Sequence, residues 1–170
     1  SYVQQSTYLE IGYSCIILEL SSINQAYSTF VAMERASDLF LSLHNLNAKL
    51  MKSMDAHLSM HGISFTEYHI LYTLSEASNQ TMSRIDLARS VELSASGVTR
   101  LIAPMEKLGM VKKEKHPRDA RKSLVKLSDS GQRVLEDSSV TFNETSATLF
   151  VTLSETQQSK MNQLCARVKR

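Results

Sequence analysis

The chain has 170 residues, a length typical of a single domain that can bury a hydrophobic core. Aromatic residues make up only 6% of it, tryptophan is absent, and there are two prolines and five glycines, a composition that favours helices and disfavours an all-β sandwich or a disordered tail. The formal net charge of +2 singles out no class of partner, so the local patterns must indicate the function.

Residues 1–36 show no hydrophobic period that persists, and we predict an N-terminal extension of uncertain structure there. Clean helical periodicity begins just after Met33, which suggests Met33 as a natural start, and the mass of the natural protein tests this. Cys15 and Cys165 are spaced too far apart for a metal motif or a disulfide framework. We expect a cytoplasmic protein with reduced thiols, because no secretory signal or membrane span is evident.

Residues 37–61 are expected to form one long helix. Ser37 or Asp38 can cap its start, and Gly62 can take the left-handed conformation that ends it. Apolar residues recur on one face at steps of three or four, namely Leu39, Leu43, Leu46, Leu50, Met54 and Leu58. A helix of this length at the edge of a small domain predicts contact with a partner subunit.

A second helix opens at 65–68 and carries Ile70, Leu71 and Leu74, and a polar loop at 78–80 closes it. Residues 81–82 fit a short strand. Ser83 with Asp86 three residues later resembles a capping box at the start of a third helix. The side chains that we expect to face the core from this third helix are Ile85, Leu87 and Ala88.

A tight turn at 91–93 leads to a fourth helix, which Ser94 caps. Its predicted buried stripe consists of Val98, Leu101, Ile102, Met105 and Leu108. The side chains expected on the opposite face are Ser96, Thr99 and Arg100, with Ala95 and Gly97 beside them. Pro104 removes a backbone N–H inside the helix, which predicts a kink and leaves the first two turns to contact a partner.

A basic hairpin follows, with predicted strands at 110–115 and 123–127 and a tip at 117–120. The span from Arg84 to Lys126 holds eleven lysines and arginines and five acids, a charge of +6, whereas the rest of the chain carries −4. Such a concentration is typical of a protein that binds a polyanion, and a solvated charged face is the alternative. The order of elements is that of a winged helix-turn-helix, with a positioning helix, a reading helix and a flap.

Two further helices are predicted at the C-terminal end. Residues 128–131 start the first, and its apolar marks are Val134, Leu135, Phe142, Leu149 and Phe150. Ser154 with Gln157 forms a capping box for the second. The apolar side of that last helix would consist of Met161, Leu164, Cys165 and Val168.

The sequence resembles the MarR (multiple-antibiotic-resistance regulator) family of bacterial transcription factors. Three pieces carry the likeness. The first lies within residues 86–101 and consists of Asp86-Leu87-Ala88-Arg89 and Leu93-Ser94-Ala95-Ser96-Gly97-Val98-Thr99-Arg100-Leu101. The second is Met105-Glu106-Lys107-Leu108-Gly109-Met110-Val111, and the third is Asp119-Ala120-Arg121 with Val125-Lys126-Leu127-Ser128 and Gly131. The resemblance implies an α+β, mostly α fold, in which a winged helix-turn-helix region at 63–128 lies between dimerisation helices at 37–62 and 129–170. Pro104 and Ala120 depart from the family pattern and predict DNA contacts that differ from those of the relatives.

The resemblance also implies which residues bind DNA. Short hydroxyls and N–H groups at the start of the fourth helix suit phosphates, and Arg100 suits a guanine edge or a phosphate. In the wing, Asp119 would brace Arg121, and Arg118 would replace the arginine that is missing at Ala120. The predicted DNA-binding set is Ser94, Ser96, Gly97, Thr99, Arg100, Arg118, Asp119, Arg121 and Lys122. In the alternative, Ser94 is only a cap, Arg100 is only solvated and the tip is an ordinary charged turn.

The implied function is that of a homodimeric DNA-binding transcriptional regulator, by family habit a repressor, which binds pseudo-palindromic operators. A small aromatic effector would release the DNA, and His44, Met60 and Tyr68 are candidate pocket residues. A winged-helix protein-interaction module without DNA-binding activity is the alternative.

An enzyme is not expected, because no serine lies in a nucleophile-elbow sequence and there is no Gly-rich phosphate loop. His57, His61 and His69 could share a face only if one helix ran through Gly62, so structural or solvated histidines are favoured over a metal site. No metal, cofactor or membrane is therefore expected. A redox-sensing role for Cys15 is a further, less favoured, alternative.

Overall fold

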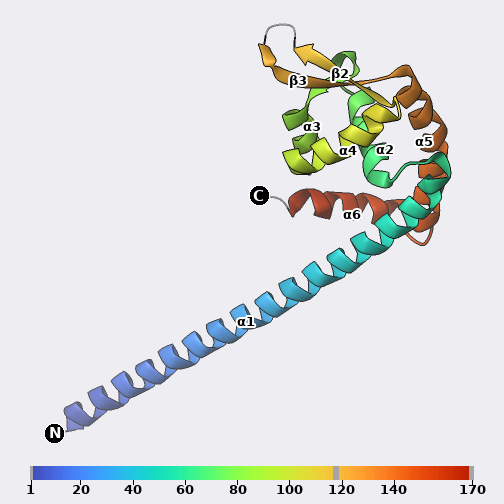
Figure 1. Cartoon of the computed structure of the whole chain (residues 1–170). Coiled ribbons are helices and arrows are strands. Elements are labelled where there is room, and N and C mark those ends of the chain that lie inside the picture. The colour runs from blue at the N-terminus through green and yellow to red at the C-terminus, as the bar shows by residue number, and fades with distance from the viewer. Residues whose placement is uncertain (1, 117–118, 169–170) are drawn as a thin grey trace. The chain divides into compact units, whose positions relative to one another are not determined.

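The computed structural model describes residues 2–116 and 119–168, and it describes side chains for 24–114 and 123–168. The helices and strands are α1 (Tyr2–Leu58), α2 (Phe65–Ser75), β1 (Thr81–Ser83), α3 (Arg84–Ser90), α4 (Ala95–Lys107), β2 (Val111–His116), β3 (Asp119–Leu127), α5 (Asp129–Leu149) and α6 (Glu155–Arg167), with 3₁₀ turns η1 (Ser59–His61) and η2 (Ser78–Gln80) (Figure 1). The chain divides into two compact units, residues 1–48 and residues 49–170.

The described part of the first unit is residues 2–48 of α1, a helix that begins at Tyr2 and not at the predicted Ser37. Ser37 does not cap a helix, because its hydroxyl donates to the carbonyl of Met33 one turn earlier (3.0 Å). Ser28 and Thr29 donate to the carbonyl of Gln25 in the same way (3.2 and 2.9 Å). Serine and threonine that bond back to the preceding turn are compatible with a helix interior, so a cap-like residue did not mark a helix end here.

The core of the second unit surrounds α2, whose Ile70, Leu71 and Leu74 are fully buried. The end of α1 contributes Met54 and Leu58, as the apolar stripe predicted. Gly62 has φ +72°, the left-handed conformation expected after the helix. The most deeply buried side chains of the elements that follow α2 are Leu87, Val98, Ile102, Met105, Val111 and Val125.

A capping box that the sequence did not single out starts α2. The Ser64 hydroxyl accepts from the backbone N–H of Glu67 (3.3 Å), and the Glu67 carboxylate accepts from the backbone N–H of Ser64 (2.8 Å). The next N–H, that of Phe65, donates to the Asp55 carboxylate (2.7 Å). The first turn of α2 is therefore fixed by groups on both sides of the Gly62 turn.

Replacing Ser64 with alanine removes the acceptor for the Glu67 N–H, and we expect it to destabilise the protein by about 1 kcal/mol. At roughly 2–4 °C per kcal/mol for a chain of this size, the melting temperature falls by about that much. Thermal unfolding followed by circular dichroism measures the shift. The exposed Ser90 is the matched control, and an equal loss for Ser90→Ala would show that the effect is not one of capping.

Three antiparallel strands form the sheet, in the order β1-β3-β2. β1 adds a short strand that pairs Met82 with Val125, and β2 pairs with β3 from Val111↔Leu127 to Lys115↔Ser123. The alternation predicted for β3 is confirmed, because Val125 and Leu127 are buried while Lys126 is only half-buried. The hairpin closes more tightly than predicted, with His116 paired to Asp119.

The junction between the hairpin and α5 is buried. Ser128 caps α5 by accepting from the Gly131 N–H (2.9 Å), and its hydroxyl lies 2.5 and 2.9 Å from the carbonyl oxygens of Gly109 and Met110. The start of α5 is therefore joined to the end of α4 and the start of β2.

The buried face of α5 is less apolar than predicted. Leu135 is buried, but the other fully covered side chains are Ser138 and Thr145. Val134, Phe142 and Leu149 are partly buried against the core. The predicted capping box of α6 is confirmed by the reciprocal bonds between Ser154 and Gln157. None of the helices, over the part of the chain that the structure describes, is long and apolar enough to cross a membrane.

Candidate nucleic-acid interface

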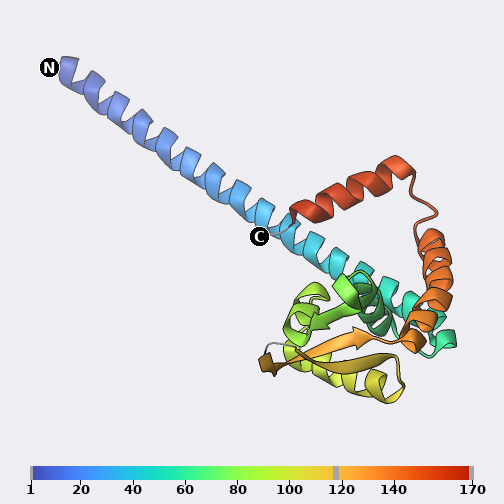
Figure 2. The same cartoon turned by 90° about the horizontal axis from the view of Figure 1, so that it is seen from above.

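The helix-turn-helix is formed by α3 and α4. The chain reverses at Glu92 (φ +53°), and the Leu93 N–H donates to the carbonyl of Ala88 (2.9 Å). Leu87 and Ala88 of α3 and Val98 of α4 are buried in the same core. Figure 2 shows the two helices beside the strands of the hairpin. One face of α4 is thus held rigidly, and the other is left to solvent.

Two residues that were predicted to be buried are exposed. Ile85 is 65% exposed, because at about 100° per residue it lies far around the helix from Leu87. Leu108 is 63% exposed, because α4 ends at Lys107 and Leu108 follows the last turn instead of continuing the stripe. Gly109 then takes φ +73°, and the Met110 N–H bonds back to the carbonyl of Met105 (2.9 Å), a pattern that ends helices.

Pro104 lies inside α4, which continues past it as a helix to Lys107. Proline has no N–H to donate to the carbonyl four residues earlier, and here that carbonyl belongs to Arg100 on the exposed face, where water can satisfy it. The first two turns of α4, before Pro104, contain Ser96, Thr99 and Arg100, the exposed polar residues that were predicted to bind DNA.

The exposed face of α4 contains four of the predicted residues, Ser94, Ser96, Thr99 and Arg100, and Gly97 is half-buried beside them. The Ser94 hydroxyl accepts from the Gly97 N–H (3.0 Å), so Ser94 is the helix cap. Thr99 donates to the carbonyl of Ala95 (2.8 Å), which leaves its oxygen free to accept. The first turn of α4 therefore offers solvent a row of small polar groups and the positive end of a 13-residue helix.

Some of the basic side chains of this region are paired and others are free. Arg89 contacts the Asp86 carboxylate (3.3 Å), and Lys126 contacts that of Glu114 (3.4 Å). Arg100 forms no ion pair with any side chain that the structure describes. Lys112 and Lys113 of β2 are exposed. The free guanidinium of Arg100 is the group best placed on α4 to meet an anion.

The wing residues are described only through their backbone. Asp119, Arg121 and Lys122 belong to β3, close to the point where the pairing register shifts between Lys115 and His116. Their side chains, including the predicted contact between Asp119 and Arg121, lie outside the described residues, as does the whole of Arg118. The wing contacts therefore remain a prediction.

The residues predicted for an effector pocket lie in different places. His44 is an exposed residue of the first unit, Met60 is 76% exposed, and Tyr68 is buried. Tyr68 lines a pocket of about 520 Å³ between α2 and α5 in the second unit. The pocket is lined by Phe65, Tyr68, His69, Tyr72, Ser139, Phe142 and Asn143. The ring residues of α2 recur at steps of three, one and three, a helical spacing that sequence reasoning could have found.

The three histidines that were considered for a metal site have partners within the protein. His61 Nε2 lies 2.8 Å from the Thr141 hydroxyl, His57 Nδ1 lies 2.8 Å from the carbonyl of Ser53, and the His69 ring stacks on that of Phe65. Over the described residues, no group of three or more His, Cys, Asp or Glu is placed to hold a metal ion. Cys165 is exposed, and the Cys15 side chain lies outside the described residues.

Comparison with known proteins gives a consistent result. Residues 63–123, which span α2 to the wing, match the family model described as the MarR family. The repressor YetL of Bacillus subtilis is 27% identical over 115 residues, which cover 67% of this chain and 69% of YetL. The transcriptional activatory protein BadR of Rhodopseudomonas palustris is 33% identical over 105 residues, or 61% of this chain and 60% of BadR.

The chain also shares its fold with solved structures of other proteins. Sco3205, a MarR family transcriptional regulator of Streptomyces coelicolor crystallised in complex with DNA, matches with a TM-score of 0.73 and 23% identity, over 76% of this chain and 82% of that one. The match confirms the predicted mostly helical, winged helix-turn-helix fold. These relatives are transcriptional regulators and not enzymes. Over residues 63–123 the chain thus matches the MarR family of transcriptional regulators, and it shares its fold with solved structures of that family.

Proposed function

We propose that this regulator binds operator DNA with the exposed face of α4. The observation that carries the proposal is the unpaired Arg100 beside the capped N-terminus of α4, on a face whose reverse side is fully buried. Backbone N–H groups and short hydroxyls there suit phosphates, and an arginine suits guanine or phosphate. Sco3205, whose fold this chain shares, was crystallised with DNA, which supports the same use of the fold.

The proposed DNA-binding form is a homodimer. Eight large apolar side chains of the first unit are exposed in the single chain, namely Tyr27, Phe30, Met33, Leu39, Phe40, Leu41, Leu43 and Leu46. Further apolar side chains are exposed on and after α5, namely Val140, Val151, Leu164 and Val168. These side chains are numerous enough for the roughly 800 Å² per partner that a stable interface buries. A two-fold axis would then present two copies of α4 to a pseudo-palindrome.

The proposed direction of regulation is repression, because YetL is a repressor. BadR is a transcriptional activatory protein, so transcription from a promoter that carries the selected site must be measured with and without the regulator. The pocket between α2 and α5 is the proposed effector site. An effector that binds one arrangement of the two α4 helices more tightly shifts the population toward it and so changes the affinity for DNA.

Selection from random duplex DNA tests the proposal. We expect an enriched pseudo-palindrome with half-sites about one helical turn apart, and an association constant that falls steeply as salt rises, because bound phosphates release counterions. Analytical ultracentrifugation of the protein–DNA complex should give two chains per duplex. No enriched palindrome, together with weak binding that does not respond to salt, would leave the protein-interaction module as the better reading.

A further inference from the structure

An open groove lies along the outer face of the three-stranded sheet. Its volume is about 1440 Å³. The register places Thr81 of β1 opposite Lys126 of β3, and Ser83 of β1 opposite Leu124 of β3. Residues that pair across strands share a face of the sheet, and so do residues two apart, so these four side chains form one floor. This floor faces away from the core, in which Val125 is buried on the other side of the sheet.

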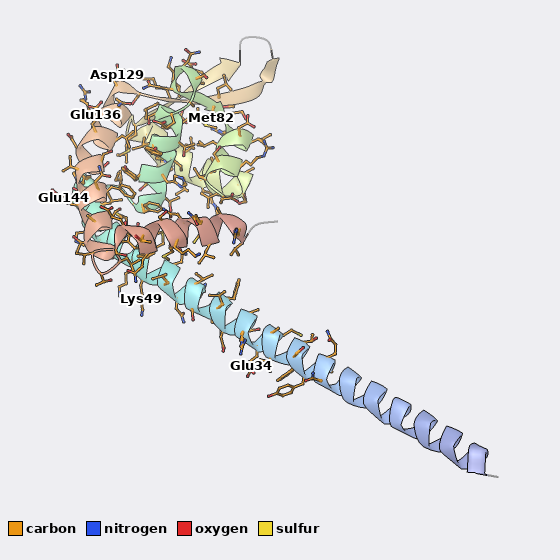
Figure 3. The ribbon with its side chains drawn as sticks, turned by 180° about the vertical axis from the view of Figure 1, so that it is seen from behind. Glu34, Lys49, Met82, Asp129, Glu136 and Glu144 are labelled. Atoms are coloured by element: carbon orange, nitrogen blue, oxygen red, sulfur yellow. The ribbon has the colours of Figure 1, made fainter. Side chains whose placement is uncertain are left out.

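The walls of the groove come from the elements that precede and follow β1. They belong to the end of α2 and the turn η2 on one side, and to the start of α3 on the other. The main wall residues are Glu76, Ser78 and Asn79 on the first side and Arg84, Ile85 and Asp86 on the second. Figure 3 labels Met82, the middle residue of β1, which also lines the groove. The groove therefore follows β1 from one end to the other.

Two polar atoms at the α3 end of the groove lack a partner. Arg84 Nε and Ser123 Oγ are buried, and neither forms a hydrogen bond with a residue that the structure describes. Because Ser83 pairs with Leu124, Arg84 and Ser123 start from neighbouring backbone positions. A buried donor without an acceptor is unfavourable, and native proteins contain few of them. The long Arg84 side chain lines the groove and can turn toward an acceptor there, so a carboxylate bound at this end would satisfy both groups.

The charges of the groove are only partly paired. Asp86 contacts an arginine of its own helix (3.3 Å), and Glu114 contacts Lys126 (3.4 Å). Arg84 and Glu76 form no ion pair with a side chain that the structure describes. The groove thus offers a partner one unpaired positive group at the start of α3 and one unpaired negative group at the end of α2. A partner with an acid and a base at its two ends would complement both.

The size and shape of the groove favour an extended peptide over a small molecule. Pockets for small ligands measure about 300–1,000 Å³, and this groove is larger and open. Ile85 is 65% exposed beside Arg84, and Leu124 is half-buried on the floor, so an aliphatic side chain can pack against both. β1 is an edge strand in the order β1-β3-β2, and an edge strand offers backbone N–H and C=O groups to a further strand.

We propose that the groove binds an extended peptide segment of a partner protein. An acidic residue of the segment bonds to Arg84 and Ser123, an aliphatic residue packs on Ile85, and a basic residue meets Glu76. The chain enters β1 from the Glu76 wall and leaves it at Arg84, so a segment antiparallel to β1 has its acid first and its base last. Alternate residues of an extended chain share a side, which spaces the three side chains two residues apart. The inference goes beyond the proposed function and does not depend on DNA binding.

A blocked peptide of sequence Gly-Glu-Thr-Leu-Thr-Lys-Gly carries these features, and the matched probe has glutamine in place of its glutamate. Each peptide carries a fluorescent label and is titrated with the full chain at neutral pH, and fluorescence anisotropy measures the affinity. We expect the glutamate peptide to bind at least fivefold more tightly than the glutamine peptide, because only a carboxylate makes charge-assisted bonds to Arg84. No saturable binding of the glutamate peptide, or equal affinities for the two peptides, would overturn the proposal.

Arg84→Gln tests which group receives the carboxylate. This variant should bind the two peptides equally, because the glutamate has lost its partner. The comparison is made between two peptides on one protein, so a smaller folded fraction would affect both alike. Arg133→Gln makes the same charge change on an exposed residue of α5 outside the groove and should keep the fivefold preference. A preference that survives in Arg84→Gln, or disappears in Arg133→Gln, would show that the peptide does not bind at Arg84.

Ile85→Ser tests the apolar contact of the same peptide. The side chain is exposed, so the fold should tolerate the change, and we expect the affinity for the glutamate peptide to fall at least fivefold. Leu108→Ser is the matched control, because Leu108 is 63% exposed and lies outside the groove. It should change the affinity less than twofold. Equal losses for the two variants, or no loss for Ile85→Ser, would contradict the placement of the peptide along β1.

Discussion

Replacing Gly131 with alanine is expected to destabilise the protein by about 3 kcal/mol, the upper part of the range for overpacking in a close-packed interior. With a shift of roughly 2–4 °C per kcal/mol for a chain of this size, the melting temperature falls by about 6–12 °C. Thermal unfolding by calorimetry measures the change. Ordinarily the substitution of alanine for glycine within a helix stabilises it, so the expected sign is opposite to that of helix propensity.

The reason is the approach of α5 to the start of β2. A Cβ at Gly131 would lie 2.0 Å from the carbonyl oxygen of Met110 and 2.9 Å from Leu127 Cδ1. The nearest obstacle is backbone, which cannot rotate away as a side chain can. The same Met110 carbonyl accepts from the backbone N–H (3.1 Å) and the hydroxyl (2.9 Å) of Ser128. Relief of the clash would therefore disturb the Ser128 cap that joins α5 to the hairpin.

Gly97→Ala is the matched control, because Gly97 also lies in a helix and has an ordinary φ. Its Cβ would meet the Ser94 hydroxyl at 3.1 Å, which can move slightly, and we expect a change within about 1 kcal/mol. If Gly131→Ala were no more destabilising than Gly97→Ala, the tight junction described here would be wrong.

The elements with strong local signals were predictable from sequence. The helix-turn-helix, the hairpin and the Ser154 capping box all appear where period and cap chemistry placed them. Residues 128–131 were predicted to start a helix, and Ser128 and Gly131 are also part of the family resemblance. The structure gives it a physical basis, since Ser128 caps α5 and Gly131 makes room for the carbonyl of Met110.

The failures have physical causes that the sequence does not display. Residues 24–36 lack an apolar period, yet they contain no proline or glycine to stop the helix, so α1 continues through them. Ile85 was assigned to the core because it is apolar, whereas it lies on the opposite side of α3 from the buried Leu87. The aromatic pocket forms where α5 packs against α2. The residues that meet there lie about seventy positions apart in the chain, and no local sequence pattern predicts such a contact.

Removing the Arg100 side chain is expected to lower the affinity of the proposed homodimer for its selected operator about 100-fold. A single arginine on a base or phosphate contributes about 1–3 kcal/mol, and a two-fold symmetric complex loses two of them. Arg100 is exposed and makes no ion pair with a described side chain, so Arg100→Ala should leave the melting temperature nearly unchanged. Fluorescence anisotropy with the selected duplex, at several salt concentrations, measures the affinity.

Salt dependence distinguishes the two possible contacts of Arg100. If the guanidinium contacts phosphate, the loss is uniform across sequences and the salt slope falls by about one for each contact removed. If it contacts a guanine edge, the affinity falls most for the preferred operator, and the protein discriminates less between bases at one position of each half-site. Both results place α4 on the DNA.

Arg133→Ala is the control, since it removes an exposed arginine from α5, outside the helix-turn-helix. It lowers the net charge of the chain by the same amount, so any effect of charge on DNA affinity at long range should appear in both variants. We expect Arg133→Ala to change the affinity less than threefold. Equal losses for the two variants would mean that DNA responds to the charge of the protein as a whole, and the exposed face of α4 would then not be the surface that contacts the operator.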